Sequence, residues 1–339
     1  MTRYSQATLE VGGLAIPNRV FLAPMAGVTD LPFRRLVAGH GAGLTVSEMV
    51  AGEWLANGHE GTLAKVERDE AGIHVVQLVG RDAAAMAEGV RHAEDAGAQI
   101  IDINMGCPAR KVTGGYGGAA LMRDPDLALR LVEATVAAAR VPVTLKMRLG
   151  WDETSINAPE IAKRAVEAGV AMIAVHGRTR NQFYGGSADW SAIAAVKDAV
   201  AVPVVANGDL VDATDAPRML ALSGADAVMI GRGSIGRPWF PGMVARHLET
   251  GVVEAEPEGS ALIEELAGLL EAMLSHWGHE HGIRLARKHL AAAMKRLEGE
   301  ARAELGERRR AVLTGTCPDA VIRELGAFVE AAGSIRRAA

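Results

Sequence analysis

Short aliphatic runs recur along the first two thirds of the chain, and each is followed by polar residues and then by an amphipathic stretch. The amphipathic stretches, such as 83–98 and 159–170, place apolar residues at helical spacing and reach Gly97 or Gly169 near their ends. Glycine at such a position is typical of a helix stop. The eight aliphatic runs, which we predict to be strands, are Val20–Ala23, Leu44–Val46, Val75–Leu78, Ile100–Ile103, Val143–Leu145, Met172–Val175, Val204–Ala206 and Ala227–Ile230.

Strands that alternate with helices predict a parallel α/β sheet, which is either open and doubly wound or closed into a barrel. Eight units of similar length favour the closed form, a (β/α)8 TIM barrel. A barrel of this kind takes roughly 250 residues, so the chain is long enough for the barrel and a modest extension.

The strand pattern ends after Arg232, and the rest of the chain shows helical spacing only. A polar, proline-containing stretch at 251–259 has the composition of a linker. We therefore predict a catalytic TIM-barrel domain over 1–245, a linker over 246–259 and a small all-helical C-terminal domain over 260–339.

The composition is that of a packed globular protein. Of the 339 residues, 49% are hydrophobic and 23% are charged, which argues against extensive disorder. The net charge of −5 does not attract nucleic acid, so an RNA site would depend on local basic patches. The chain lacks an apolar run of membrane-spanning length, and its first residues lack the layout of a secretory signal, so we expect a cytoplasmic protein.

Cysteine and histidine usage argues against a structural metal. Cys107 and Cys317 are the only cysteines, too few for a disulfide framework or a zinc site, and they fit a reducing compartment. His276, His279 and His281 resemble a metal cluster, but no second ligand group accompanies them at zinc spacing. We expect no metal.

Polar side chains concentrate where the predicted strands end. TIM barrels build their active sites from the loops at the carboxyl ends of the strands, so these side chains should meet at one mouth. They include Ser47, Glu48, Gln77, Asn104, Cys107, Lys146, Arg148, His176, Arg178, Asn207, Asp209 and Arg232.

The last two strand ends carry glycine turns, where TIM barrels commonly bind a phosphate. The backbone amides of Gly208 and Gly231, together with the Arg232 guanidinium, are suited to hold a dianion. Either segment alone would be interpreted as an ordinary turn, but the two together favour a phosphate site.

Side chains at three other strand ends indicate which kind of phosphate-containing ligand would bind. Gln77 offers both an amide donor and an acceptor, as recognition of a heterocycle requires. Lys146 can stabilise a ring that gains electrons, and His176 can bond a carbonyl oxygen of the ring or of the substrate. Gln77 and His176 also fit satisfied polar residues of a core, whereas a buried lysine without a partner is costly.

Seven motifs in this order resemble the bacterial tRNA-dihydrouridine synthases, nearest the B type. They are LAPMAGVTDLPFRRL, VVQLVG, DINMGCPARKV, PVTLKMRLGWD, VHGRTR, PVVANGD and GADAVMIGRGSIGRPW. The resemblance is strong over about residues 12 to 250 and weaker beyond. Ala286–His289 (ARKH) also looks like this family, but Leu290–Ala293 stand where the B type usually has aromatic residues.

The resemblance implies FMN as the bound cofactor, NADPH as the reductant and uridines of tRNA as the substrate. It implies that Pro24, Met25 and Ala26 line the flavin and that Gln77 and Lys146 bind its ring. It also implies a site for the FMN tail and Cys107 as the active-site acid. The tail site consists of Asn207, Gly208, Asp209, Gly231 and Arg232.

Reduction of the uracil C5–C6 double bond needs a hydride on one carbon and a proton on the other. The resemblance implies that reduced FMN delivers the hydride to C6. A thiol with a pKa of about 8.5 is mostly protonated at neutral pH, so Cys107 can protonate C5 while Asn104 bonds the base. The competing interpretation is that Cys107 is a small buried apolar residue.

A uridine in folded tRNA is stacked, and drawing it out costs a few kcal/mol that contacts to RNA must offset. Arg110 and Lys111 lie beside Cys107, and Arg148, Arg178 and Arg180 lie on neighbouring loops. Basic residues in the helical region share one helical stripe, which also fits a solvated helix face. They are Arg284, Arg287, Lys288, Lys295 and Arg296.

Two other functions fit parts of this pattern. A reductase or dehydrogenase of a free pyrimidine, such as dihydroorotate, would use the same FMN barrel and cysteine. A non-catalytic RNA-binding regulator could keep the fold. A protein that had lost its activity need not keep Cys107, Lys146, His176 and Arg232, so their presence argues against a non-catalytic regulator. The helical region favours tRNA over a free pyrimidine as the substrate.

Overall fold

The computed structural model describes residues 8–57, 60–68, 72–115, 117–298 and 303–338. The chain forms two compact units. The first comprises Met1–Gly233 and Phe240–Val253, and we call it the barrel unit. The second comprises Ser234–Trp239 and Glu254–Ala339, and we call it the helical unit.

Within the described residues, nine strands of the barrel unit form one parallel sheet. Eight of them coincide with the eight predicted strands, to within a few residues at their ends. In sheet order the strands are β4 (Leu44–Thr45), β3 (Val20–Leu22), β11 (Ala227–Ile230), β10 (Val204–Asn207), β9 (Met172–His176), β8 (Val143–Arg148), β7 (Ile100–Met105), β6 (Val75–Val79) and β5 (Val50–Ala51).

The sheet closes on itself. Val46, just after β4, pairs in parallel with Val75 of β6, and the backbone N–H of Ser47 donates to the Val75 carbonyl at 3.1 Å. This bridge joins one end of the sheet to its far side, so the predicted TIM barrel is confirmed. The carboxyl ends of the strands therefore surround one mouth.

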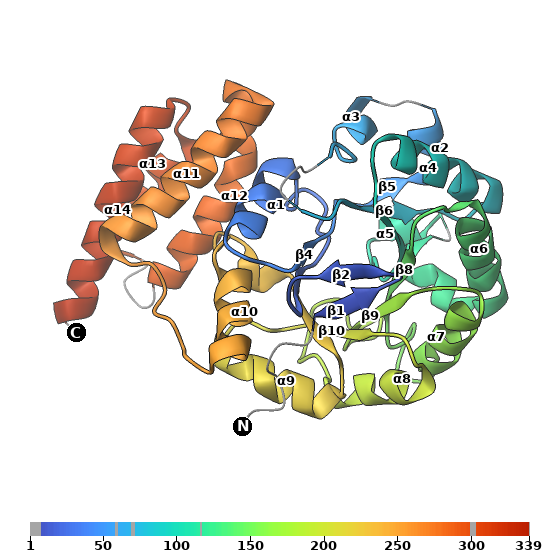
Figure 1. Ribbon diagram of the computed structural model, residues 1–339. Helices are drawn as coiled ribbons and strands as arrows, with labels where there is room; N and C mark the ends of the chain where they lie inside the picture. Colours follow the sequence, from blue (N-terminus) through green and yellow to red (C-terminus); the bar gives the residue numbers. More distant parts are fainter. Residues whose placement is uncertain (1–7, 58–59, 69–71, 116, 299–302, 339) are drawn as a thin grey trace. The chain divides into compact units, whose positions relative to one another are not determined.

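Helices cover the outside of the barrel (Figure 1). Asp30, Asp82 and Asp124 cap three of them by accepting a hydrogen bond from a first-turn N–H. Gly97 and Gly169 follow two helices with φ of +88° and +109°, as expected for the predicted stops. The helices are α1 (Leu31–Gly39), α2 (Gly52–Ala56), α3 (Glu60–Leu63), α4 (Ala83–Asp95), α5 (Arg110–Thr113), α6 (Pro125–Ala138), α7 (Ala158–Glu167), α8 (Ala194–Ala199), α9 (Ala216–Ser223) and α10 (Phe240–Thr250).

An antiparallel hairpin precedes the barrel and was not predicted from the sequence. It consists of β1 (Leu9–Val11) and β2 (Leu14–Ile16), joined by Gly12 and Gly13 at φ of +55° and +85°. Its buried residues Val11 and Ile16 pack with residues at the amino ends of the barrel strands. The hairpin therefore closes the end of the barrel opposite the mouth, and Figure 1 shows it in blue across the ring of strands.

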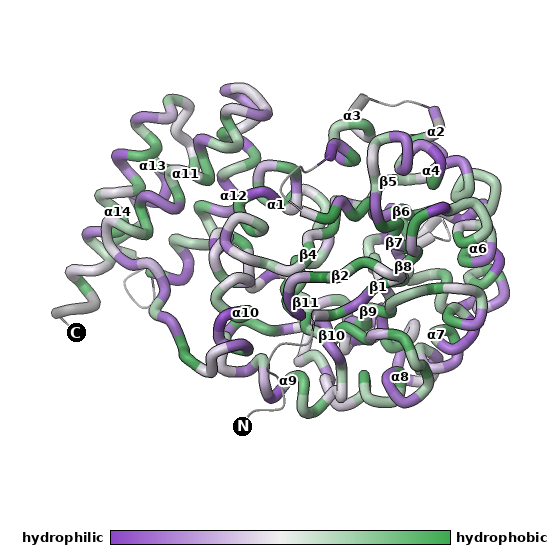
Figure 2. The backbone as a smooth tube through the Cα atoms, in the orientation of Figure 1, coloured by the Kyte–Doolittle hydropathy of each residue, from purple (hydrophilic) through white to green (hydrophobic). Residues whose placement is uncertain are grey.

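The helical unit has no strand among its described residues. Its helices are α11 (Gly259–Trp277), α12 (His279–Glu298), α13 (Gly306–Thr314) and α14 (Pro318–Ala338). They bury a leucine-rich core that includes Leu266, Leu270, Leu290 and Phe328. Figure 2 shows hydrophobic positions in green along these helices and along the barrel strands. None of the described helices has both the length and the apolar character that crossing a membrane requires.

Candidate active site

Cys107 lies just after β7, in a turn that a neighbouring amide holds in place. The Asn104 Oδ1 atom accepts hydrogen bonds from the backbone N–H groups of Gly106 and Cys107, at 3.1 and 2.9 Å. The Cys107 carbonyl accepts from the Ala119 N–H at 3.0 Å. The turn is therefore fixed from both sides, and the cysteine side chain is half-buried.

The thiol of Cys107 favours its protonated form. Burial raises its pKa, and the Ala109 amide with the positive charges on Arg148 and Lys146 opposes this only in part. A thiol with a raised pKa is a proton donor at neutral pH, not a nucleophilic thiolate.

A buried hydrogen-bond chain links the Cys107 turn to three strands. The Asn104 Nδ2 donates to Gln77 Oε1 at 2.7 Å, and Gln77 Nε2 donates to an Asp102 carboxylate oxygen at 2.6 Å. The other Asp102 oxygen accepts from the Thr144 hydroxyl at 2.6 Å. Asp102 accepts from the Gln77 amide nitrogen, so the Gln77 oxygen faces Asn104, and this oxygen in turn orients the Asn104 amide. Neither Asp102 nor Thr144 was singled out from the sequence, although both point inward on predicted strands.

Lys146 brings a buried positive charge to the same mouth. It lies on β8 opposite Asn104 of β7, and its Nζ donates to Asn207 Oδ1 at 3.1 Å. Burial lowers its pKa to about 8, and the repulsion of Arg148 adds to this, while Asp102 and Cys107 act in the opposite direction. An ammonium that is this poorly solvated is poised to receive a negative charge.

His176, at the end of β9, is neutral. Burial lowers its pKa to about 2, and the positive charges on Lys146, Arg148, Arg178 and Arg232 act in the same direction. The His176 Nε2 lies 3.3 Å from an Arg178 guanidinium nitrogen, which assigns Nε2 as the acceptor and Nδ1 as the protonated nitrogen.

We expect His176 to make the protein acid-sensitive. Between pH 6.5 and 2 the unfolded chain binds this proton and the folded chain does not, so stability is complete above pH 6.5 and falls as the pH drops. From pH 6.5 to pH 5 the loss is about 2 kcal/mol of unfolding free energy. The change His176→Gln keeps an acceptor for Arg178 and should remove this loss in urea titrations at pH 7 and 5. His92→Gln, on the surface of α4, serves as the control, and a His176→Gln protein that is as acid-sensitive as wild type would contradict the assignment.

Asp209 organises two arginines at the end of β10. Arg178, whose side chain is 1% exposed, donates to both Asp209 oxygens, and Arg232 donates to one of them at 2.9 Å. The Ala188 N–H also bonds this carboxylate. Asp209 therefore orients Arg232, which remains 49% exposed.

Backbone geometry and packing beside Asp209 require a glycine at position 208, in the predicted phosphate site. Gly208 has φ of +125°, and a Cβ there would lie 2.6 Å from the Ala188 side chain, so only glycine fits. The Asn207 Nδ2 donates to the Met229 carbonyl at 2.8 Å, which ties β10 to β11 next to Gly231. A Cβ on Gly231 would lie 3.7 Å from the Met25 sulfur. The segment Pro24–Ala26 thus borders the same end of β11.

The buried side chain of Arg148 connects the Cys107 turn to the loop after β9. Its side chain is 1% exposed and donates to the carbonyls of Gly106 (2.8 Å), Thr179 (2.8 Å) and Phe183 (3.0 Å). Arg178 similarly donates to the carbonyls of Gly185 and Gly186. The two arginines hold the loop after β9 against the Cys107 turn. Their predicted contact with RNA stays a prediction.

The other predicted RNA residues differ in their exposure. Arg110 and Lys111 are exposed on α5, directly after the Cys107 turn. Arg180 is half-buried in the loop after β9. In the helical unit, Arg287 donates to the Gly315 carbonyl at 3.1 Å, and Lys288 is half-buried on α12.

Glu48, which the sequence places at a strand end, is a buried residue of the mouth. It is 5% exposed, and its carboxylate accepts from the Gly27 N–H. It therefore fixes the loop that follows Pro24–Ala26.

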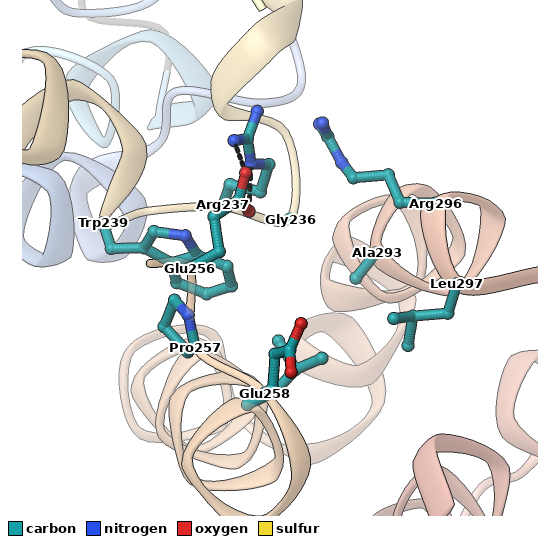
Figure 3. Close-up of a pocket in the computed structure, with 10 residues that line it drawn as sticks. Gly236, Arg237, Trp239, Glu256, Pro257, Glu258, Ala293, Arg296 and Leu297 are labelled. Carbon is teal, nitrogen blue, oxygen red and sulfur yellow. Dashed lines mark hydrogen bonds and ion pairs between the residues drawn. The ribbon is translucent and has the colours of Figure 1, made fainter. Parts of the chain in front are cut away.

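The helical unit contains a cavity of about 340 Å³, drawn in Figure 3. Arg237 lines this cavity, has a side chain that is 4% exposed, and pairs with Glu256. Figure 3 shows Arg296 pointing toward the end of the cavity where Arg237 lies. Burial lowers the pKa of Arg296 to about 10, and the charge on Arg237 adds to this. Because Glu256 and Glu258 balance the two arginines, the cavity has no net charge that would select an anion.

Comparisons with known proteins match the chain to one enzyme family. The family model described as "Dihydrouridine synthase (Dus)" matches residues 21–315. A probable tRNA-dihydrouridine synthase of Rhodobacter capsulatus is 54% identical over 88% of this chain and 93% of its own. A tRNA-dihydrouridine synthase B of Xanthomonas axonopodis pv. citri is 48% identical over 83% of this chain and 85% of its own.

Solved structures with low identity share the fold. Morphinone reductase matches with a TM-score of 0.52 and 17% identity, over 75% of this chain and 92% of its own. An old yellow enzyme homologue from Zymomonas mobilis matches with a TM-score of 0.51 and 15% identity, over 75% of this chain and 94% of its own.

Proposed function

The chain belongs to the dihydrouridine synthase family, and from this premise we propose that it reduces uridines of tRNA to 5,6-dihydrouridine, with bound FMN and NADPH as the reductant. It is a flavin-dependent oxidoreductase by family. The observation that carries the proposal is that a protonated thiol, Cys107, and a buried ammonium, Lys146, lie at the carboxyl ends of adjacent strands of one mouth.

The residues of the mouth fit FMN. The exposed Arg232 guanidinium, held by Asp209, is suited to a phosphate. Asp209 would then act through Arg232, because its oxygens already accept three groups and would repel a phosphate. We propose that Gly231 and Asn207 complete this site and that Pro24–Ala26, Gln77, Lys146 and His176 border the ring.

When bound, FMN reduced by NADPH would supply the hydride for C6 of the uracil. Cys107 donates its proton to C5, so the C5–C6 double bond becomes a single bond and the base gains two hydrogens. The raised thiol pKa keeps this proton available. The Cys107 thiolate that results is stabilised by the charges on Arg148 and Lys146 and takes its next proton from solvent.

Asn104 holds the Cys107 turn in place, so few of its hydrogen-bonding groups remain for the uracil base. Its Oδ1 already accepts two backbone bonds, and one amide hydrogen is committed to Gln77. Among the described residues, the remaining hydrogen has only a sulfur contact, in which Asn104 Nδ2 lies 3.8 Å from Met49 Sδ. We propose that a carbonyl of the uracil replaces this weak contact.

The helical region and the basic loops suit a large anionic substrate better than a free pyrimidine. We propose residues 1–245 as the catalytic domain, 246–259 as a linker and 260–339 as a tRNA-binding domain, with the reaction in the cytoplasm. Arg110, Lys111 and Arg180 would contact RNA near the mouth, and Arg287 and Lys288 would do so from α12. Arg148 and Arg178 would act by positioning the loop after β9.

The proposal is tested with the purified full chain. We expect it to bind FMN with a yellow colour, to bleach slowly with NADPH, and to form dihydrouridine in tRNA taken from cells that lack the gene. Dihydrouridine is measured by mass spectrometry of tRNA digests, and dihydroorotate and free uracil are the competing substrates. Turnover of a free pyrimidine without activity on tRNA would overturn the proposal, and absence of FMN binding would overturn the cofactor assignment.

A further inference from the structure

Four side chains on the rim of the mouth alternate between arginine and aromatic rings. The Arg123 guanidinium lies 4.9 Å from the Trp151 ring centroid, and the Arg180 guanidinium lies 4.5 Å from both the Trp151 and the Phe183 rings. We call Arg123, Trp151, Arg180 and Phe183 the rim stack. It joins the segment before α6 to the loops that follow β8 and β9. Such contacts are energetically favourable even at exposed sites.

The positive charges of the rim stack have no carboxylate partner in the described part of the chain. Neither Arg123 nor Arg180 forms an ion pair there, and the Arg180 Nε atom is buried with no hydrogen-bond partner. Asp152, the acidic residue next to Trp151, accepts instead from Thr154 and Ser155 in its own turn. The stack therefore presents net positive charge that suits an anion.

Phe183 holds a strained backbone and leaves part of its ring open. Its φ is +50°, in the left-handed region where glycine or asparagine is less strained. The conformation is held by two hydrogen bonds: the Phe183 N–H donates to the Arg180 carbonyl, and Arg148 donates to the Phe183 carbonyl. The Phe183 side chain is 36% exposed, so burial alone gives little reason for an aromatic residue here.

The rim stack is anchored to the Cys107 turn. Arg148 donates to the carbonyls of both Gly106 and Phe183, so one buried side chain spans the two segments. An Arg180 guanidinium nitrogen lies 3.4 Å from the Thr113 hydroxyl of α5, the helix that follows Cys107. A ligand that occupies the rim stack therefore also lies beside the candidate reaction site.

We infer that the rim stack binds an unpaired nucleobase of the RNA that adjoins the reduced uridine, with the base on the open face of Phe183 and its phosphate near Arg180 and Arg123. The inference rests on the proposed function and adds a recognition site to it. Aromatic rings and arginine planes are the surfaces on which proteins stack unpaired bases. A site of this kind holds the strand on one side of an extruded base, which offsets the loss of stacking.

The test compares variants of Phe183 in the full FMN-loaded chain. Phe183→Leu keeps an apolar side chain of similar size, and we expect it to raise the Kd for unmodified tRNA and the KM about tenfold. Phe183→Tyr restores an aromatic face and should return both constants to within about twofold of wild type. Leu222→Ala, which removes an exposed apolar side chain near the end of α9, is the matched control.

Two further variants separate stacking from folding and from charge. Phe183→Gly removes the ring and relieves the left-handed backbone, so it should keep the melting temperature while raising Kd as Phe183→Leu does. Arg123→Gln should lower the slope of log K against log salt by about one, as the loss of one phosphate contact does.

The outcomes distinguish this inference from the proposed function. If wild type forms dihydrouridine but Phe183→Leu and Phe183→Gly match its Kd and KM, the rim stack does not bind RNA. If wild type forms no dihydrouridine, the proposed function fails, and the Kd values for tRNA and for a short oligouridylate still decide the rim stack. If Phe183→Leu and Phe183→Tyr raise the Kd for tRNA and the KM to the same extent, stacking on the ring is not the cause.

Discussion

Cys107→Ala is expected to lower the rate of dihydrouridine formation by about 10²- to 10⁴-fold, the contribution of a positioned general acid. The thiol is the proton donor whose turn Asn104 fixes, and burial keeps it protonated at neutral pH. Without it, C5 must take a proton from water, which is not held in position. The measurement is single-turnover formation of dihydrouridine by enzyme reduced in advance with NADPH.

The controls for this variant isolate the proton step. Cys317→Ala removes the other cysteine, which is exposed, and should leave the single-turnover rate unchanged. Bleaching of Cys107→Ala by NADPH should persist, because the missing group acts on the uracil. A Cys107→Ala rate near that of wild type would assign the acid to another residue.

The pH dependence of the wild-type rate follows from the direction of the thiol pKa. Because burial raises it, Cys107 holds its proton throughout the neutral range and loses it only at alkaline pH. The proton-transfer step should therefore be flat near neutrality and slow as the pH rises past the thiol pKa.

The sequence predicted the barrel well because its signal is local and repeated. Each strand has its own aliphatic run, and stops such as Gly97 and Gly169 lie within the same unit. The hairpin Leu9–Ile16 was not predicted, because strands of three residues are too short to show a clear alternation of apolar and polar positions. Its burial depends on the barrel end that it covers, which is tertiary information.

The mouth could be predicted as a set of residues but not as a set of contacts. Placement at strand ends brings Cys107 and Lys146 together in any parallel barrel. The sequence does not reveal that Arg148 and Arg178 turn inward to bind loop carbonyls, because these acceptors belong to a loop without regular structure. The sequence also does not reveal the hydrogen bonds that link Thr144 through Asp102 and Gln77 to Asn104, because each of these bonds joins side chains of two neighbouring strands.

Lys146→Met is expected to slow bleaching of the bound flavin by NADPH about 10²- to 10³-fold, the usual effect of removing one preorganised donor. The ammonium is buried and bonds only Asn207 among the residues described, so its charge acts directly on whatever ring occupies the mouth. Methionine keeps the length of the side chain and removes the charge, so the midpoint potential of the flavin should fall as well. Lys163→Met, on the exposed face of α7, is the matched control.

The pH profile of the same reaction tests whether the charge is the cause. Because burial lowers the Lys146 pKa to about 8, the protein alone carries this charge below pH 8 and loses it above. The wild-type bleaching rate should therefore decrease as the pH rises through this region, and a negative charge on the ring would move the decrease to higher pH. Lys146→Met should be slow at every pH and lack this step. A variant that keeps the step would show that a different group titrates, and Lys146 would then be a packing residue of the mouth.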